Sequence, residues 1–294
     1  MKTKKKELKP MSSIRMMVRG TYDIQKLRIQ MGNRIVVNFK SKLGQKPSTK
    51  ESEIGTDEKK LLDKIRLSYR KITDGVVDKL PSQKNFVGDE LISDYTELCL
   101  VDQYIELEAR ELDHFKQLEK EVARYRLYNE FLKGIKGCGA AMSGVIISEI
   151  DITKARYASS LWKYAGLDVA QDGRGRGKYK EHLTTQSYID TEGVEQEKQG
   201  ITFKPFLKTK LLNVLGGSFL KCKSPYSEHY YNYKNRLETD TRHQEKSKGH
   251  IHNMAQRYMI KRFLCDLYIA WRTLEGLEVH AEYHEAKHGH VHRG

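Results

Sequence analysis

The chain has 294 residues, of which 38% are hydrophobic and 31% charged. This length allows about two domains of ordinary size, and the composition is that of a folded chain rather than of a disordered one. The formal net charge of +14 and the pI of about 9.4 favour a polyanionic partner, either nucleic acid, the ribosome or an anionic membrane surface.

No segment approaches the ~20 consecutive apolar residues that span a bilayer, and no apolar segment follows the basic start of the chain. We therefore expect no membrane span and no signal peptide. The four cysteines form no Cys-x-x-Cys pair, which argues against a zinc knuckle and a disulfide framework. These features predict a cytoplasmic protein, associated with the nucleoid if its partner is DNA.

The first third of the sequence is basic and helical in pattern. Residues 1–12 are a lysine-rich tail, which either contacts phosphate groups or is a solvated terminus. Residues 13–90 form a basic helical region, with one helix expected over 13–43 and a second over 56–76, after a loop that contains Gly, Pro and Ser. Asp57 and Glu58 suit the N-terminus of that second helix.

Residues 91–130 are predicted to form a long coiled-coil helix. The apolar seam, with alternating spacings of three and four, consists of Leu98, Val101, Ile105, Leu112 and Phe115. Glu108 occupies one seam position, and the near absence of Gly and Pro favours a continuous helix. The partner of this helix is either a second copy of the chain, which would give a homo-oligomer, or a neighbouring helix of the same chain.

A glycine-rich turn follows in the segment FLKGIKGCGAAMSGVIISEI, residues 131–150. A short turn between two apolar segments is typical of a helix-hairpin-helix. Gly137 and Gly139 would let the backbone approach a phosphate, which the first N–H groups of the next helix would face. Lys133 and Lys136 add positive charge. We predict that this hairpin holds a sugar-phosphate backbone without reading bases; the alternative is a tight turn made of small, closely packed residues.

Several separated motifs after the hairpin occur in one order. They are EIDI at 149–152, SSLWKYAGLD at 159–168, GITFKPFLKTKLL at 200–212, SPYSEHYYNYKNRL at 224–237 and HIHNMAQRYMIKRFLCDLYIAWR at 250–272. With the hairpin, they resemble the C-terminal domain of the bridge-RNA insertion-sequence transposases (the IS-one-ten and IS-one-sixteen type), and the long helix resembles the coiled-coil linker of that family. The resemblance covers residues 91–275 and implies DNA transposition or recombination, with DNA and a structured guide RNA as partners.

The sequence departs from this family where the family carries its catalytic groups. The family has an N-terminal resolvase-like domain with four acidic metal ligands, and residues 1–90 show no apolar strand that holds such a residue. The family's serine nucleophile lies in the loop after Tyr-Ala-Gly-Leu, where this chain has Gln171 and Asp172. Ser187 is the candidate nucleophile if an insertion has shifted the register. Catalysis by this chain stays open, with Mg²⁺ as the cofactor if it occurs.

That loop keeps cations interleaved with glycines. They are Arg174, Arg176, Lys178 and Lys180. Because guanidinium groups pair with phosphate and glycine permits close approach, we predict that they contact DNA, the alternative being a basic loop without a ligand. Farther along, Tyr226, Tyr230 and Tyr233 either stack on exposed bases or lie in the core.

Residues 276–294 form a histidine-rich tail. His280, His284 and His288 are four residues apart and would lie on one face of a helix, which makes them candidate zinc or nickel ligands. The alternative is a solvated tail in which these histidines hold no metal.

We predict a mainly α-helical protein with a transposase-like helix-hairpin-helix domain over residues 131–275. A small β-hairpin is expected near residues 188–203, with Tyr188 and Ile189 facing Ile201 and Phe203. The predicted function is DNA binding by a relative of insertion-sequence transposases, which acts in transposition or recombination or is a domesticated derivative without catalysis. The alternatives are an active recombinase with a serine nucleophile and an RNA-binding partner protein.

Overall fold

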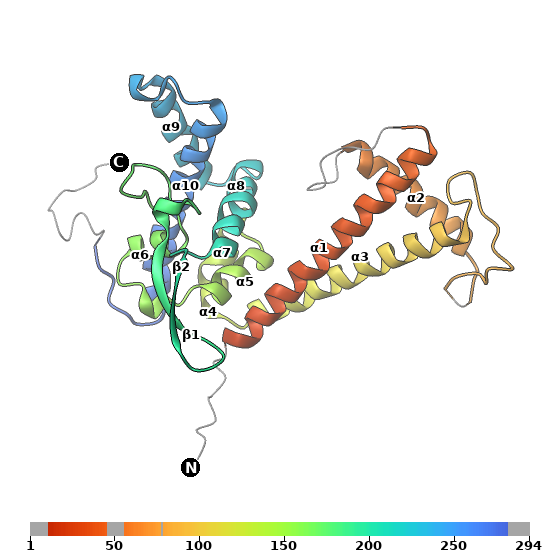
Figure 1. Cartoon of the computed structure of the whole chain (residues 1–294), viewed down its shortest axis with the longest axis horizontal. Helices are drawn as coiled ribbons and strands as arrows, with labels where there is room; N and C mark the ends of the chain where they lie inside the picture. Colours follow the sequence, from red (N-terminus) through yellow and green to blue (C-terminus); the bar gives the residue numbers. More distant parts are fainter. Residues whose placement is uncertain (1–10, 46–55, 78, 282–294) are drawn as a thin grey trace, which may run out of the picture. The chain divides into compact units, whose positions relative to one another are not determined.

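The computed structural model of the chain describes residues 11–45, 56–77 and 79–281 (Figure 1). In this part the protein is mainly α-helical, with one two-stranded antiparallel sheet, which confirms the predicted fold class. None of the described helices is both long and apolar enough to cross a membrane. The chain divides into an N-terminal unit, residues 16–117, and a C-terminal unit, residues 1–15 together with 118–294.

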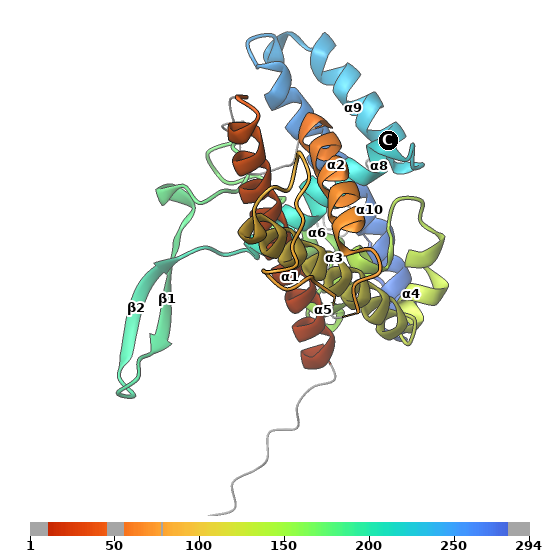
Figure 2. The ribbon, with the colours of Figure 1, turned by 90° about the vertical axis from the view of Figure 1, so that its right-hand side faces the viewer.

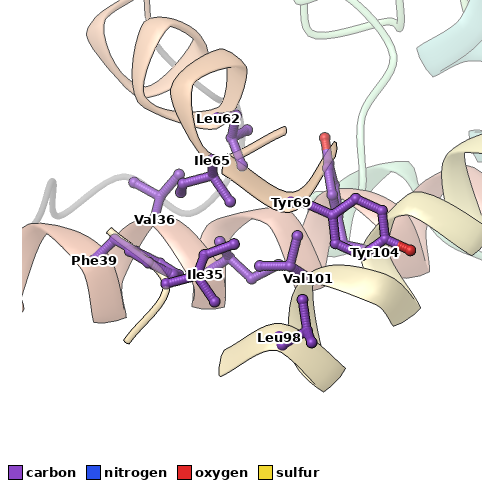
Figure 3. Close-up of a cluster of buried hydrophobic side chains, with 10 residues drawn as sticks. Ile35, Val36, Phe39, Leu62, Ile65, Tyr69, Leu98, Val101 and Tyr104 are labelled. Carbon is purple, nitrogen blue, oxygen red and sulfur yellow. The ribbon is translucent and has the colours of Figure 1, made fainter. Parts of the chain in front are cut away.

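The N-terminal unit is built from most of α1 (Met11–Lys42), all of α2 (Thr56–Thr73) and most of α3 (Tyr95–Val122). Apolar side chains from the three helices and from the segment before α3 form one buried cluster, of which Figure 3 shows the packing. The cluster consists of Ile35, Val36, Phe39, Leu62, Ile65, Tyr69, Ile92, Leu98, Val101 and Tyr104. The predicted helices therefore form a three-helix core.

Within this unit, α3 lies along α1 of the same chain. The rings of Tyr22 and Phe115 meet edge to face at 6.4 Å, and Gln25 donates to Glu111 over 2.9 Å. Arg28 also donates to Glu111. The partner helix of the predicted seam is thus α1, whereas a homo-oligomer stays a prediction.

The seam prediction was wrong at Leu112, whose side chain is 56% exposed. The buried position belongs to Glu111, because Arg28 supplies the opposite charge that a buried carboxylate requires. Glu108, the predicted polar intrusion, is likewise paired: its carboxylate lies 2.6 Å from the guanidinium of Arg66 in α2. The inward side of α3 therefore holds interhelical ion pairs as well as apolar side chains.

The C-terminal unit contains many short helices and one sheet. Its elements after α3 are α4 (Arg126–Glu130), η1 (Leu132–Gly134), α5 (Ala140–Glu149), η2 (Ile152–Lys154), α6 (Ala158–Tyr164), η3 (Lys180–His182), β1 (Thr184–Ile189), β2 (Glu195–Gly200), α7 (Pro205–Thr209), η4 (Lys210–Gly216), α8 (Gly217–Lys221), α9 (Tyr226–Thr239), η5 (Thr241–His243) and α10 (Lys248–Leu274).

Helices α5 and α10 carry the core of this unit. Every residue of α5 from Met142 to Glu149 is buried. Helix α10 buries a stripe with four-residue spacing and packs against α9, α6, α4 and η4. The stripe consists of Ile251, Ala255, Met259, Phe263 and Leu267. Such a stripe is what a helix presents to a core when it crosses several neighbours.

A continuous helical run formed by α7, η4 and α8 lies against α10, and its middle part, η4, is a π-helix. A side chain at Gly216 would meet the amide of Gln256 at 2.9 Å. The glycine at the end of the π-helix therefore lets α10 approach closely.

Strands β1 and β2 form the predicted hairpin, a ribbon that stands clear of the helices of its own unit (Figure 2). The predicted register was wrong, because Tyr188 pairs with Gln196 and Ile189 with Glu195. Asp190 closes a shorter turn than expected by accepting hydrogen bonds from two backbone N–H groups. Most side chains of both strands are exposed, so no burial pattern in the sequence could set the register.

Candidate nucleic-acid interface

The glycine turn that opens α5 is held in place by Gly137. This residue has φ +94°, and a side chain on it would meet the ring of Phe219 at 3.1 Å. Its carbonyl accepts a hydrogen bond of 2.8 Å from the hydroxyl of Ser218 in α8. Both the left-handed backbone and the close packing require glycine here, so the fold alone accounts for Gly137.

Gly139 is in a different setting. It is the N-cap residue of α5, with an ordinary extended backbone (φ −74°, ψ 175°), and a Cβ on it would meet no atom within 4 Å. No side chain caps the start of α5; glycine, like serine, threonine, aspartate and asparagine, is favoured at such positions, but it leaves the first N–H groups without a side-chain acceptor. Neither conformation nor packing requires glycine at this exposed position.

The two lysines of the hairpin, Lys133 and Lys136, are exposed. Among the described residues, neither forms an ion pair with a carboxylate. They lie in the same short turn as Gly139, beside the first N–H groups of α5, which have no acceptor within the helix. The segment before the positive end of the α5 dipole therefore carries two exposed lysines that form no ion pair with a carboxylate among the described residues.

The carboxylate at the other end of α5 is fully compensated. Glu149 is buried, and its side chain forms an ion pair of 2.8 Å with Arg15, a residue at the start of α1 that belongs to the C-terminal unit. The hydroxyl of Tyr164 donates to the Glu149 carbonyl over 2.9 Å. The acidic motif after the hairpin is therefore a structural anchor in this chain.

The loop after α6 has a defined structure held by hydrogen bonds. Val169 and Gly175 form an antiparallel bridge. Beyond it, the Gly177 N–H donates to Nδ1 of the buried His182 over 3.0 Å, so that Nε2 carries the imidazole proton and faces Asp172 at 3.0 Å. His182 and Asp172 thus fix the path of this loop.

The predicted cations of this loop fall into two groups. Arg174, Lys178 and Lys180 are exposed and form no ion pair among the described residues. Arg176 instead binds Asp168 inside its own loop, over 2.8 Å. The first three remain available to a ligand, whereas Arg176 serves mainly the structure of the loop.

The remaining predicted site residues do not come together. Ser187 lies on β1, exposed and directly opposite Glu197. His280 lies beside the ring of Tyr157, and its Nδ1 is 3.5 Å from a carboxylate oxygen of Glu278. His284 and His288, like the N-terminal tail up to residue 10, lie outside the described residues. Within the described ranges, no three His, Cys, Asp or Glu side chains could hold a metal ion together.

The tyrosine stripe of α9 packs against its own unit. Tyr230 is buried, Tyr226 stacks on Phe219 at 5.1 Å, and Tyr233 stacks on Tyr258 at 4.4 Å. These contacts favour the interpretation that the three tyrosines pack within the unit over the alternative that they stack on bases.

Sequence reasoning missed one group of charged residues, which we call the cation cluster: Lys208 on α7, and Arg257 and Lys261 on α10. Among the described residues, Asp168 is the carboxylate whose charge acts on all three cations, and it is already paired with Arg176. The ammonium group of Lys208 donates to the Arg176 carbonyl. The ammonium group of Lys261 lies 5.1 Å from the ring centroid of Trp162.

The cations of this cluster are partly buried and repel one another. Burial, and then the charge of Arg257, lowers the pKa of Lys208 to about 8. The same two causes lower the pKa of Lys261, and burial lowers the pKa of Arg257. Arg257 and Lys261 are four residues apart on one helix, which was visible in the sequence, but only the fold brings Lys208 and Asp168 to them.

Comparison with protein-family models, with curated proteins and with solved structures finds no match for this chain. The candidate interface therefore rests on the chemistry of the residues that form it.

Proposed function

We propose that the C-terminal unit binds the sugar-phosphate backbone of nucleic acid, with DNA as the main ligand, as a relative of the insertion-sequence transposases that its motifs resemble. The observation that carries this proposal is Gly139. An exposed N-cap glycine that neither its backbone nor its neighbours require leaves room at the start of α5 for a group outside the chain. A phosphate fits this position, because the N–H groups of a first helical turn bind anions.

Other exposed charges of the C-terminal unit support the same ligand. Lys133 and Lys136 of the hairpin, and Arg174, Lys178 and Lys180 of the loop, are exposed without a carboxylate partner in the described part of the chain. Cations that repel one another and gain nothing from the fold are expected where a polyanion binds. Contacts of this kind hold the backbone and carry no sequence information.

The proposal is one of binding and assigns no catalytic step to this chain. Ser187, the candidate nucleophile, shares one face of the β-ribbon with Glu197, because directly opposite residues of an antiparallel pair point the same way. That carboxylate would repel an approaching phosphodiester.

The sharpest test compares Gly139→Asp with Gly139→Asn. Both residues are good N-caps, so thermal unfolding should show that either variant folds as well as the parent. Aspartate places a negative charge where the phosphate would lie, whereas asparagine has the same shape without the charge. We expect Gly139→Asp to lose about tenfold or more in affinity for duplex DNA relative to Gly139→Asn, measured by fluorescence anisotropy. Equal affinities of the two variants would contradict the proposal.

A pair of charge reversals tests the location of the interface. Lys136→Glu with Arg174→Glu should weaken DNA binding and its salt dependence, whereas Lys59→Glu with Lys64→Glu, on exposed positions of α2, changes the net charge equally and should weaken binding less. Sequencing the nucleic acid that co-purifies with the protein identifies the ligand as DNA or RNA. If the α2 pair alone abolished binding, and the ligand were duplex RNA, the interface would lie on the N-terminal helices instead.

A further inference from the structure

The cation cluster holds more positive charge than its surroundings neutralise. Lys208, Arg257 and Lys261 come from two helices, and the carboxylate that acts on them, Asp168, already neutralises Arg176. Desolvation of a cation without a matching anion costs free energy. A cluster that serves only the fold would be expected to contain a second carboxylate or fewer cations.

Two buried donors in this region also lack an acceptor. Nη1 of Arg257 and Nε1 of Trp162 are buried and make no hydrogen bond within the described residues, and the same holds for one acceptor of the region, Oδ1 of Asp168. Buried N–H groups are paired in the great majority of cases, and an exception points to a water or an ion that completes the site. Both donors belong to the surroundings of Lys261, whose ammonium group lies near the Trp162 ring and whose pKa is lowered by the charge of Arg257.

The loop after α6 makes room for Arg257 and contacts Lys208 through its backbone. A side chain on Gly175 would collide with the guanidinium of Arg257, so glycine at this position admits the arginine. Lys208 is oriented by the Arg176 carbonyl and lies over the ring of Phe203 at 4.7 Å. Backbone and aromatic contacts thus position the cations without neutralising them, which is the arrangement of a preorganised anion site.

We propose that Lys208, Arg257 and Lys261 form a binding site for a single phosphate group, which on the proposed function is a phosphodiester of the bound nucleic acid. A guanidinium donates in a fork that matches phosphate oxygens, and two ammonium groups add charge without fixed geometry. A phosphodiester brings one negative charge and two non-bridging oxygens, and would therefore add a second anion to the one that Asp168 already supplies. The same chemistry would accept free phosphate or a nucleotide, and the test separates these sources.

The test uses the full chain and inorganic phosphate as the first probe. Lys261→Gln removes one cation, and Lys221→Gln removes an exposed lysine of α8 as the matched control. At constant ionic strength, replacing chloride by phosphate should raise the unfolding temperature of the parent and of Lys221→Gln by a few degrees, but not that of Lys261→Gln. In chloride, Lys261→Gln should unfold at a higher temperature than the parent, because a repulsive charge is gone. The unfolding temperature in chloride remains informative even if a variant binds no phosphate.

Duplex DNA without terminal phosphates is the second probe. We expect Lys261→Gln to bind it about tenfold more weakly, with a salt slope smaller by about 1. If the parent bound no DNA but responded to phosphate through Lys261, the proposed function would fail and the site would take a free phosphate or nucleotide. If the parent bound DNA and Lys261→Gln matched it in DNA affinity, salt slope and phosphate response, the cation cluster would not be a phosphate site, although the proposed function would stand.

Discussion

The two units use positive charge in opposite ways. In the N-terminal unit, cations between the helices meet carboxylates: Arg66 lies 2.6 Å from Glu108, and Lys42 lies 2.8 Å from Glu97. In the C-terminal unit, Arg15 and Arg176 are paired in the same way, but the hairpin lysines and the exposed loop cations form no ion pair with a carboxylate among the described residues. The cluster formed by Lys208, Arg257 and Lys261 shares Asp168 with Arg176. The first arrangement holds helices together, and the second leaves charge for a ligand.

This difference teaches that a net charge of +14 says little about where a polyanion binds. The N-terminal helices carry many basic residues, yet several of them are neutralised by α3. The location of the unpaired cations is more informative than their number, since the field of a neutralised pair falls off quickly. Three changes in single residues sharpen or break this contrast.

The largest effect is expected where a paired charge is removed. Glu111→Ala leaves Arg28 partly buried without its carboxylate, and we expect the N-terminal unit to lose about 2 kcal/mol of stability. Urea unfolding followed by far-UV circular dichroism measures this loss. Both tryptophans, Trp162 and Trp271, lie in the C-terminal unit, so their fluorescence serves as the internal control.

The double change Arg28→Met with Glu111→Met removes both charges and should regain much of that stability, because no buried charge is then left alone. If Glu111→Ala left the helical transition unchanged, the ion pairs of the N-terminal unit would not hold its helices together.

In the C-terminal unit, removal of a cation from the cluster should raise the stability instead of lowering it. Lys208→Met keeps the aliphatic packing and removes a charge whose pKa is lowered to about 8 by burial and by Arg257. We expect a gain of about 1 to 2 kcal/mol at pH 7, a value reduced for partial exposure. Thermal unfolding at pH 7 measures it. A loss of stability would mean that Lys208 belongs to the fold.

The pH dependence gives a second check on Lys208. The unfolded chain binds this proton up to about pH 10.5, whereas the folded chain releases it near pH 8. The destabilisation is therefore fully present below pH 8 and is relieved as the pH rises toward 10.5. The advantage of Lys208→Met should disappear over this window. Lys79 in the N-terminal unit behaves in the reverse manner, because its hydrogen bond to Glu106 raises its pKa, and its contribution is lost only at still higher pH.

Much of the fold could be predicted from local pattern. Helical periodicity placed α1 and α2, and the glycine turn marked the start of α5. The errors arose where local spacing was not enough: Leu112 is exposed while Glu111 is buried and paired with Arg28, and the β-ribbon has too few buried side chains to set its register.

The candidate site was predictable only in part, for the same reason. Lys133, Lys136 and Gly139 lie within one turn, and local sequence sufficed to find them. The cluster of Lys208, Arg257 and Lys261 is assembled from two helices, and its carboxylate comes from a third segment. Nothing in the sequence indicated that Arg176 would be neutralised by Asp168 while its neighbour Arg174 stays unpaired.

The smallest effect on stability is expected for the exposed hairpin lysines. These lysines also give the most direct test of the contrast between the two units. Lys136→Gln removes a charge that no carboxylate meets, so the free energy of unfolding should change by less than about 0.5 kcal/mol. DNA affinity should fall at every sequence tested, and the slope of log affinity against log salt should decrease by about 1. Lys136→Gln would then change DNA affinity without changing the stability, which is the result expected if the charge of Lys136 serves binding. An unchanged salt slope would instead place Lys136 among ordinary solvated lysines and confine binding to the loop and the cluster.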